Sequence, residues 1–338
     1  MVAATTGSGG GVIEARITGT GSFLPEKRLT NDDLARLVDT SDEWIVSRTG
    51  IRERRLLSPG EPPSRMGVAA AREALAAAGV APQEVDLLIA ATNVSEQPIP
   101  GTAPFIAAGL GLSQEPAFFD LKCGCAGFVY GLAFAAGAVA AGLARRALVV
   151  GIEALSRFTD WSDRRTCVLF GDGAGAVLVE ASPGRAGVLG VSLHGDASKL
   201  GLLKLEAGGV RLPASQDTVR MGLHYLKMEG EGVFRSAVPM MERATREALA
   251  QAGLTPGEVD WLIPHQANLR IIRPLAARLG IPEARVVVNI DRVANTSTAS
   301  IPIALDEWVR AGKIAPDQIV VLTAFGAGAS YGTVVVRW

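Results

Sequence analysis

The 338-residue sequence predicts an α/β protein made of two similar halves. Three observations support this prediction: a long internal repeat, several Val- and Ile-rich runs, and helical segments too apolar to be exposed. Runs of this kind without polar alternation are typical of strands covered on both faces. Two α/β halves packed together form five layers, α/β/α/β/α, with a buried layer of helices in the middle.

The composition is that of a globular protein with a large core: 48% of residues are hydrophobic and 20% are charged. The net charge of -1 gives no reason to expect nucleic acid or a membrane as a partner. The 3 cysteines cannot form a disulfide framework, and they suit a reducing cytoplasm. Residues 1–12 have no basic segment before an apolar one, so we expect a flexible tail and no signal peptide.

The repeat pairs residues 73–89 ("EALAAAGVAPQEVDLLI") with residues 247–263 ("EALAQAGLTPGEVDWLI"), which agree at about a dozen of seventeen positions. Each copy has the features of an Ala-rich helix end, a glycine after the helix, a proline turn and a buried strand. We therefore expect an N-terminal half over residues 13–182 and a C-terminal half over residues 183–338.

A second similarity links residues 167–180 with residues 322–338, since each reads as an apolar strand, a Gly-rich turn and another apolar strand. This pattern predicts a β-hairpin in each half. Further strands are expected at 147–155, 286–290 and 318–325. The glycine string at 171–176 fits the dinucleotide-binding fingerprint in form only, because it leads into a strand and not into a helix.

Two of the cysteines lie close together in "FFDLKCGCAGFVYGL", at Cys123 and Cys125. A strand is expected over 117–121, followed by an apolar helix that starts just after Cys125. A helix N-terminus stabilises a thiolate, so Cys125 is a candidate nucleophile, and an inert core thiol is the alternative. A metal pair lacks further ligands, and a disulfide between residues two apart is geometrically poor. Cys123 is expected to be a packed bystander.

The repeat also indicates where the two halves differ, because Ala91 in the first copy aligns with His265 in the second. Sites of α/β proteins gather at the carboxyl ends of strands, where His265 is expected. Asn295 lies where a polar loop enters a helix, and a helix cap is the alternative for it. Cys, His and Asn together can form a nucleophilic site, but their spacing does not establish that they meet.

At these residues the chain resembles the β-ketoacyl-acyl-carrier-protein synthase III family of thiolase-fold condensing enzymes, over residues 14–338. The strings that carry the resemblance include "CAGF", "VLFGDGAGAV", "DWLIPHQANLRII", "NTSTASIPIALDE" and "AFGAGASYG". The thiolase fold that the resemblance implies is a duplicated α/β fold of five layers, in agreement with the prediction made from the repeat.

The resemblance implies a role for each candidate residue. Cys125 would take the acyl group from a thioester, and His265 and Asn295 would bind a malonyl-type thioester and stabilise its enolate. The carbanion would then attack the acyl-Cys125 in a Claisen condensation. The backbone N–H groups of Cys125 and Ala327 would form the oxyanion hole.

The resemblance also implies two binding surfaces. The side chains matched to coenzyme A or pantetheine binding are Trp44, Arg48, Arg164 and Phe234. Those matched to acyl carrier protein binding are Arg235 and Arg270. No metal and no redox cofactor is needed, and the expected assembly is a cytoplasmic homodimer in which the strand containing "FFDL" pairs across a two-fold axis.

The sequence departs from the family around the acyl pocket. Lys122–Gly124 replace small apolar residues, and Glu231 replaces a common Asn. Ile99 replaces a Phe that often reaches across the dimer to the partner's acyl pocket. Ala329 replaces a bulky aromatic residue, and Tyr331 replaces a Trp. The loss of two rings at Ile99 and Ala329 predicts a wider acyl pocket or a second channel for an acceptor longer than malonyl.

Three functions follow from the resemblance. The departures favour a natural-product enzyme that joins longer acyl or β-ketoacyl thioesters, for example to an α-pyrone. The alternative is a fatty-acid initiation enzyme that condenses acetyl- or short branched acyl-CoA with malonyl-acyl carrier protein. A catalytically silent partner subunit is a third function, and the intact Cys125, His265 and Asn295 argue against it.

Overall fold

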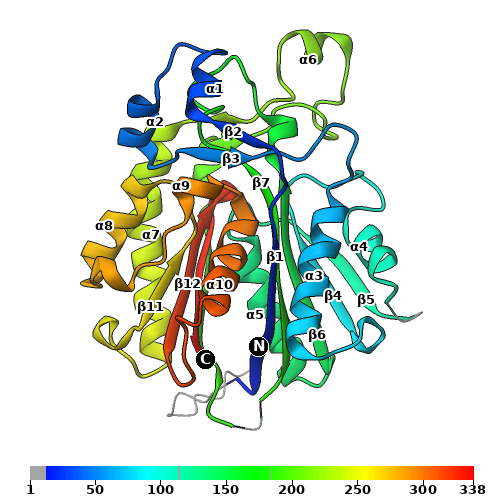
Figure 1. The fold of residues 1–338 in the computed structure, drawn as a ribbon, viewed down its shortest axis with the longest axis vertical. Helices are drawn as coiled ribbons and strands as arrows, with labels where there is room; N and C mark the ends of the chain where they lie inside the picture. Colours follow the sequence, from blue (N-terminus) through cyan, green and yellow to red (C-terminus); the bar gives the residue numbers. More distant parts are fainter. Residues whose placement is uncertain (1–12, 113–114, 183) are drawn as a thin grey trace.

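The computed structural model describes residues 13–112, 115–182 and 184–338, and its two large β-sheets have helices between them and on both outer sides (Figure 1). The predicted tail over residues 1–12 lies outside the described residues. Within the described residues, no helix combines the length and the apolar character needed to cross a membrane.

The first sheet has five strands in the order β1-β7-β6-β4-β5. Its strands β4, β5 and β6 are parallel to one another. Strand β7 pairs antiparallel with β6, and the edge strand β1 pairs antiparallel with β7. The bounds are β1 (Ala15–Phe23), β4 (Leu87–Ala91), β5 (Ala117–Leu121), β6 (Arg146–Ala154) and β7 (Asp172–Ala181).

The second sheet has four strands in the order β11-β12-β13-β8. Strands β11 and β12 are parallel. Strand β13 pairs antiparallel with β12, and the edge strand β8 pairs antiparallel with β13. The bounds are β8 (Gly187–Gly195), β11 (Trp261–Pro264), β12 (Ile319–Gly326) and β13 (Ser330–Arg337).

Six helices complete the five layers (Figure 1). Helices α3 (Ser64–Ala78) and α4 (Ala103–Leu110) cover the outer face of the first sheet, and α7 (Gly230–Gln251) and α8 (Leu269–Leu279) that of the second. Helices α5 (Gly127–Ala140) and α10 (Ser300–Arg310) lie between the sheets. The largest buried cluster joins both inner helices to both sheets, through side chains such as Phe128, Leu305, Val149 and Val334. The predicted layered architecture is confirmed.

The two sheets repeat one pattern. The strands β4-β6-β7-β1 have the same order and directions as β11-β12-β13-β8. β5 has only a remnant in the second sheet, a single parallel bridge between Val286 and Leu262. The strand predicted over 286–290 is therefore wrong in extent, since only this bridge forms.

Close packing of strand backbone against helix backbone occurs at equivalent places in the two halves. A Cβ atom added at Gly19 of β1 would lie 2.1 Å from the carbonyl oxygen of Ala74 in α3. A Cβ atom added at Gly190 of β8 would lie 2.1 Å from the carbonyl oxygen of Ala248 in α7. Ala74 and Ala248 are equivalent positions of the repeat, so each half requires a glycine where its strand meets the helix backbone.

The hairpin expected at 322–338 is confirmed as β12 and β13, but the one expected at 167–180 is wrong. There the antiparallel partner of β7 is β6, and the connection between them spans residues 155–171. Residues 155–171 instead contact the segment before α10. The backbone N–H of Asn295 donates to the carbonyl of Leu169, and the carbonyl of Asn295 accepts from the N–H of Gly171.

A group of small elements forms a cap at the end of the molecule away from the chain termini (Figure 1). Buried Arg54 joins this cap to the body: it donates to Asn31 Oδ1 at 2.9 Å and to the carbonyl of Val168 at 3.0 Å. The cap contains β2 (Arg28–Thr30), α1 (Asn31–Ala35), α2 (Asp42–Thr49), β3 (Glu53–Arg55) and α6 (Gln216–Arg220). A two-stranded ribbon, β9 (Leu203–Lys204) and β10 (Lys227–Met228), and helix α9 (Ile290–Val293) complete the elements.

We expect Gly190→Ala to lower the free energy of unfolding by about 1–3 kcal/mol, because the new methyl group overlaps the α7 backbone. Gly137→Ala in α5 is the matched control, since a Cβ atom there meets nothing within 4 Å and alanine favours helix. Urea unfolding followed by circular dichroism measures both changes. Equal stability of the two variants would contradict the proposed packing constraint.

Candidate active site

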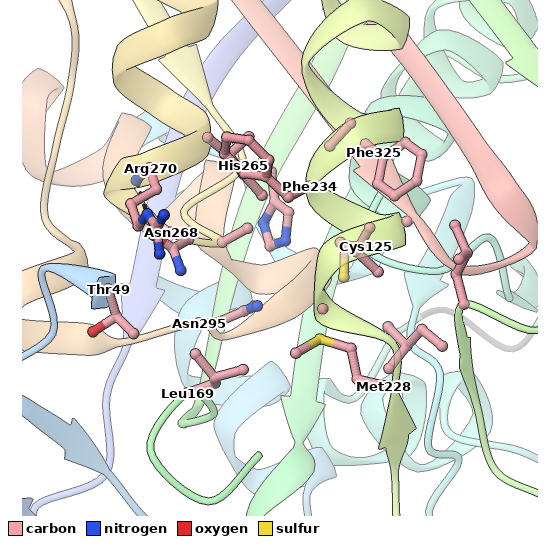
Figure 2. A pocket seen from close by; sticks show the side chains of 18 of the residues that line it. Thr49, Cys125, Leu169, Met228, Phe234, His265, Asn268, Arg270, Asn295 and Phe325 are labelled. Carbon is pink, nitrogen blue, oxygen red and sulfur yellow. Dashed lines mark hydrogen bonds between the residues drawn. The ribbon is translucent and has the colours of Figure 1, made fainter. Parts of the chain in front are cut away.

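A cavity of about 450 Å³ brings the three candidate residues together. Cys125, His265 and Asn295 all line it, and Figure 2 shows their side chains directed toward a common space. They come from three different places in the fold: before α5, after β11 and between α9 and α10. The sequence could not establish this meeting, and the structure does.

The backbone around Cys125 is packed directly against the loop between β12 and β13. A Cβ atom at Gly124 would lie 2.4 Å from Ala327 N, and one at Gly326 would lie 2.2 Å from Cys125 N. Gly124 also has a φ of 56°, which favours glycine. The two glycines therefore allow the amides of Cys125 and Ala327 to approach one another on the cavity wall, as an oxyanion hole requires.

His265 follows β11, and its backbone N–H continues the sheet by donating to the carbonyl of Thr323 at 2.8 Å. Its ring Nδ1 lies 2.7 Å from the hydroxyl of Ser300, the first residue of α10. Nε2 is then the ring nitrogen available to a molecule in the cavity. Burial lowers the pKa of His265 to about 3, so the imidazole is neutral at physiological pH.

Asn295 is oriented by the turn that follows it. Its side-chain Oδ1 accepts a hydrogen bond from the N–H of Ser297 at 2.8 Å, which leaves its Nδ2 as a donor for the cavity. It does not cap α10, whose N-cap residue is Ala299. The alternative assignment as a helix cap is therefore wrong.

The two inner helices begin at the site. Cys125 lies two residues before α5, and the turn η6 (Ser297–Ala299) leads into α10. These are equivalent places in the two halves, since α5 and α10 both occupy the middle layer (Figure 1). The positive ends of two helix dipoles therefore face the region where the nucleophile lies.

The expected thiolate is not the resting form of Cys125. Burial raises the pKa of its thiol to about 12; a hydrogen bond from Ser297 lowers this value, and the charge of Glu153 raises it. The direction of this shift is opposite to the one expected from a helix N-terminus. At neutral pH the site holds a thiol beside a neutral imidazole, and the thiol must lose its proton as it reacts.

Aromatic and cationic side chains form the outer part of the cavity. The indole of Trp44 has the guanidinium carbon of Arg48 4.5 Å from its ring centroid and that of Arg164 4.9 Å away. Phe234 and Arg270 make a similar pair at 6.0 Å. All five residues line the cavity.

Arg235 and Glu231 differ in their relation to the cavity. Arg235 is exposed, does not line the cavity, and forms an ion pair with Glu231 at 3.5 Å. Glu231, which replaces a common Asn of the family, lines the cavity.

The two residues expected in the acyl pocket behave differently. Ala329 is buried and lines the cavity together with Leu202, Met241 and Phe325. Ile99 is 86% exposed and does not line the cavity of its own chain. Its reach into a partner's pocket stays a prediction.

The unusual residues beside the nucleophile do not contact the cavity either. Lys122 is exposed and Cys123 is half-buried, and neither is among the residues that line the cavity. Tyr331 also lies outside it and stacks on His194, with ring centroids 5.2 Å apart. Of this flank, only Gly124 has a structural role at the site.

Three polar residues next to the site were not assigned from the sequence: Ser297, Ser300 and Glu153. The two serines lie in "NTSTAS", where hydroxyl residues suggest only a turn or a helix start. Glu153 interrupts the apolar strand run "ALVVGIEAL", and a single acid in such a run was the available signal. Within the described ranges, no cluster of three or more His, Cys, Asp or Glu is arranged to bind a metal ion.

We expect His265 to remain neutral between pH 8 and pH 5, because protonating the buried ring requires a pH near its lowered pKa. Nitrogen-15 NMR of histidine-labelled protein measures the ring's protonation, and His265→Ala assigns its signals. A midpoint near the ordinary histidine value would contradict the buried, neutral state.

Comparison with known proteins places this site in a family. The family description 3-oxoacyl-[acyl-carrier-protein (ACP)] synthase III matches residues 119–197, and that of its C-terminal part matches residues 249–338. The β-ketoacyl-[acyl-carrier-protein] synthase III of Symbiobacterium thermophilum is 50% identical over 323 residues, covering 95% of this chain and 97% of the relative. That of Caldanaerobacter subterraneus is 47% identical, covering 96% and 98%.

Solved structures agree. The 3-oxoacyl-[acyl-carrier-protein] synthase III of Aquifex aeolicus has a TM-score of 0.89 at 43% identity, covering 96% of this chain and all 100% of its own. The priming β-ketosynthase of the R1128 polyketide pathway has a TM-score of 0.88 at 40% identity, covering 95% and 96%. The protein OleA of Xanthomonas campestris, at 20% identity and a TM-score of 0.84, shares the fold. The chain belongs to the β-ketoacyl-acyl-carrier-protein synthase III family of thiolase-fold condensing enzymes.

Proposed function

We propose that this C–C bond-forming acyltransferase loads an acyl group onto Cys125 and condenses it with a malonyl-type thioester. The observation that supports the proposal is the meeting of Cys125, His265 and Asn295 in one cavity. A cysteine nucleophile, two neutral hydrogen-bond donors and two backbone amides are the parts that this reaction needs.

Acyl loading uses the wall on which Cys125 and Ala327 lie. Cys125 Sγ attacks the thioester carbonyl, and the two backbone N–H groups stabilise the negative charge that develops on its oxygen. The C–S bond to the donor breaks, and the acyl group remains on Cys125. Ala329 and Met241 line an apolar part of the same cavity that suits the acyl chain.

Condensation uses a second pair of hydrogen-bond donors, the side chains of His265 and Asn295. With Ser300 donating to Nδ1, His265 presents an N–H at Nε2, and Asn295 presents its Nδ2. Both donate to the carbonyl of the malonyl-type thioester, whose oxygen becomes an enolate when CO₂ leaves. A neutral imidazole keeps its proton in this role, and the resulting carbanion attacks the acyl-Cys125 carbonyl.

The outer cavity suits a coenzyme A or phosphopantetheine arm. The indole of Trp44 can stack on adenine while the nearby guanidinium groups of Arg48 and Arg164 contact phosphate. The exposed Arg235 and the cavity-lining Arg270 offer positive charge to an acidic acyl carrier protein beside the same opening.

We propose a homodimer formed through the edge strand β5. Its residues Phe118 and Phe119 are 44% and 43% exposed, and Phe134 of the following helix is 55% exposed. An unpaired edge strand with exposed aromatic side chains is suited to pairing with a second copy across a two-fold axis. Cytoplasmic location stays a prediction.

For the substrate, we propose the initiation of fatty-acid synthesis from a short acyl-CoA. Relatives 50% and 47% identical over nearly the full chain are named β-ketoacyl-[acyl-carrier-protein] synthase III. The natural-product alternative with a longer acyl group has one observation in its favour: Ala329 replaces an aromatic residue and lines the cavity. Ile99 gives it no support within the chain.

We expect Cys125→Ala to abolish acyl loading, because the variant lacks the nucleophile. Intact-protein mass spectrometry after incubation with acetyl-CoA measures the acyl mass shift. Cys123→Ala is the matched control, since that thiol lies outside the cavity, and it should load normally. Loading of Cys125→Ala together with failure of Cys123→Ala would reverse the assignment. His265→Ala and Asn295→Ala should load but fail to release a β-ketoacyl product.

We expect Ala329→Phe to reduce loading of long acyl donors at least tenfold while acetyl loading is retained, because a ring fills the apolar part of the cavity. Donors from acetyl-CoA to medium-chain β-ketoacyl-CoA, read as the mass of acyl-Cys125, make the measurement. In the wild type, fast and exclusive loading of acetyl supports the initiation enzyme. Preference for longer donors would support the natural-product alternative instead.

A further inference from the structure

A hydrogen-bonded chain runs from Cys125 away from the cavity into the protein interior. The hydroxyl oxygen of Ser297 lies 3.3 Å from Cys125 Sγ and 3.1 Å from Glu153 Oε1. Ser297 is 2% exposed and Glu153 is fully buried at 0%. Neither residue lines the cavity, so a bound substrate does not contact them.

The carboxyl group of Glu153 is held on one side and open on the other. Oε1 accepts hydrogen bonds from the backbone N–H of Asn93 at 3.2 Å and from its side-chain Nδ2 at 2.5 Å. Oε2 is buried without a hydrogen-bond partner in the structure. A proton that comes through Ser297 therefore arrives at Oε1, while Oε2 makes no hydrogen bond that this transfer would break.

The turn that carries Ser297 is built for this contact. Ser297 has a φ of 49°, a conformation that non-glycine residues rarely adopt, and Ala294 before it has a φ of 59°. Strain of this kind is kept at functional sites when surrounding contacts enforce it. Here the bond from the N–H of Ser297 to Asn295 Oδ1 holds both the turn and the proposed catalytic amide.

These hydrogen bonds connect two acidic groups, the Cys125 thiol and the Glu153 carboxyl group, which cannot both be ionised. A thiolate on Cys125 and a carboxylate on Glu153 would be like charges in a buried region, separated by one hydroxyl group. Asp172 on β7 is a further negative neighbour of Glu153, and its carboxyl group is occupied by the amides of Leu57 and Ser156. The thiol and the carboxyl group therefore hold at least one proton between them.

We propose that Glu153 takes the thiol proton of Cys125 through Ser297 during acyl loading and returns it when Cys125 is released. This proposal rests on the proposed function. Ser297 Oγ accepts the thiol proton while its own proton passes to Glu153, and the C–S bond to Cys125 forms as the C–S bond to the donor breaks. The released donor thiolate takes a proton from water. After condensation, the departing Cys125 thiolate recovers its proton by the reverse transfer, so Glu153 is a positioning residue and the protons balance.

The proposal determines the pH dependence of loading. Burial raises the pKa of Glu153 to about 8; the hydrogen bonds from Asn93 and Ser297 oppose this shift, and the charge of Asp172 adds to it. Below that pH the carboxyl group already carries a proton and cannot accept another. The loading rate should therefore rise with pH and level off above about pH 8. His265 does not replace Glu153, because burial keeps its pKa at about 3.

The test is the single-turnover rate of acyl loading from pH 6 to pH 10 in the full chain, read by intact mass with acetyl-CoA. Glu153→Gln should load about 100-fold more slowly at pH 8. Its pH profile should also lose the bend, which is the pH at which the wild-type rate levels off. Ser297→Ala should do the same, and the double variant should be no slower than either single one. Thr298→Val is the matched control, since it removes a neighbouring buried hydroxyl that has no hydrogen-bond partner.

Iodoacetamide alkylation of Cys125 over the same pH range gives a second readout that needs no acyl donor. The wild-type alkylation rate should show the bend, and Glu153→Gln and Ser297→Ala should lack it. Unchanged profiles in both variants would overturn the proposal, as would equal losses in Ser297→Ala and Thr298→Val. If the wild-type alkylation rate shows the bend but no donor loads the protein, the proposed function is wrong and the proton transfer from Cys125 to Glu153 is supported.

Discussion

The burial of two apolar helices between two sheets is the constraint on which the rest of the structure depends. Helices α5 and α10 contribute to a core that contains side chains from both sheets. Because each half must cover an inner helix, neither half can bury its apolar surface alone. The same packing brings the start of α5 and the start of α10 to one place, where Ser297 contacts Cys125 and the candidate active site lies.

This burial also sets the protonation of the site. It keeps the Cys125 thiol and the Glu153 carboxyl protonated more strongly than usual, and it keeps His265 neutral. A site of neutral groups has to move protons during the reaction, because no resting charge is available to activate the thiol. The proposed transfer from Cys125 through Ser297 is a consequence of placing a nucleophile inside the middle layer of the fold.

Duplication supplied two equivalent frameworks that then took different functions. The end of β4 carries Ala91, and the equivalent end of β11 carries His265. The start of α5 carries the candidate nucleophile Cys125, whereas the turn before α10 carries Asn295 and Ser297. What stayed alike is the backbone packing, in which Gly19 and Gly190 contact Ala74 and Ala248. Main-chain contacts of this kind tolerate no side chain, while the ends of the elements are free to diverge.

The sequence alone determined the duplicated α/β architecture, because the repeat and the apolar strand runs record which faces must be buried. It also identified Cys125, His265 and Asn295 as candidates, since each is an unusual residue at the end of a recognisable element. Only the tertiary structure decided that they meet, that Ile99 and Cys123 lie outside the cavity, and that burial keeps the thiol protonated. The contact between Ser297 and Glu153 was beyond the sequence for the same reason: residues 144 positions apart form a hydrogen bond only because α10 packs on the first sheet. Proximity and desolvation are properties of the packed layers, and local sequence does not encode them.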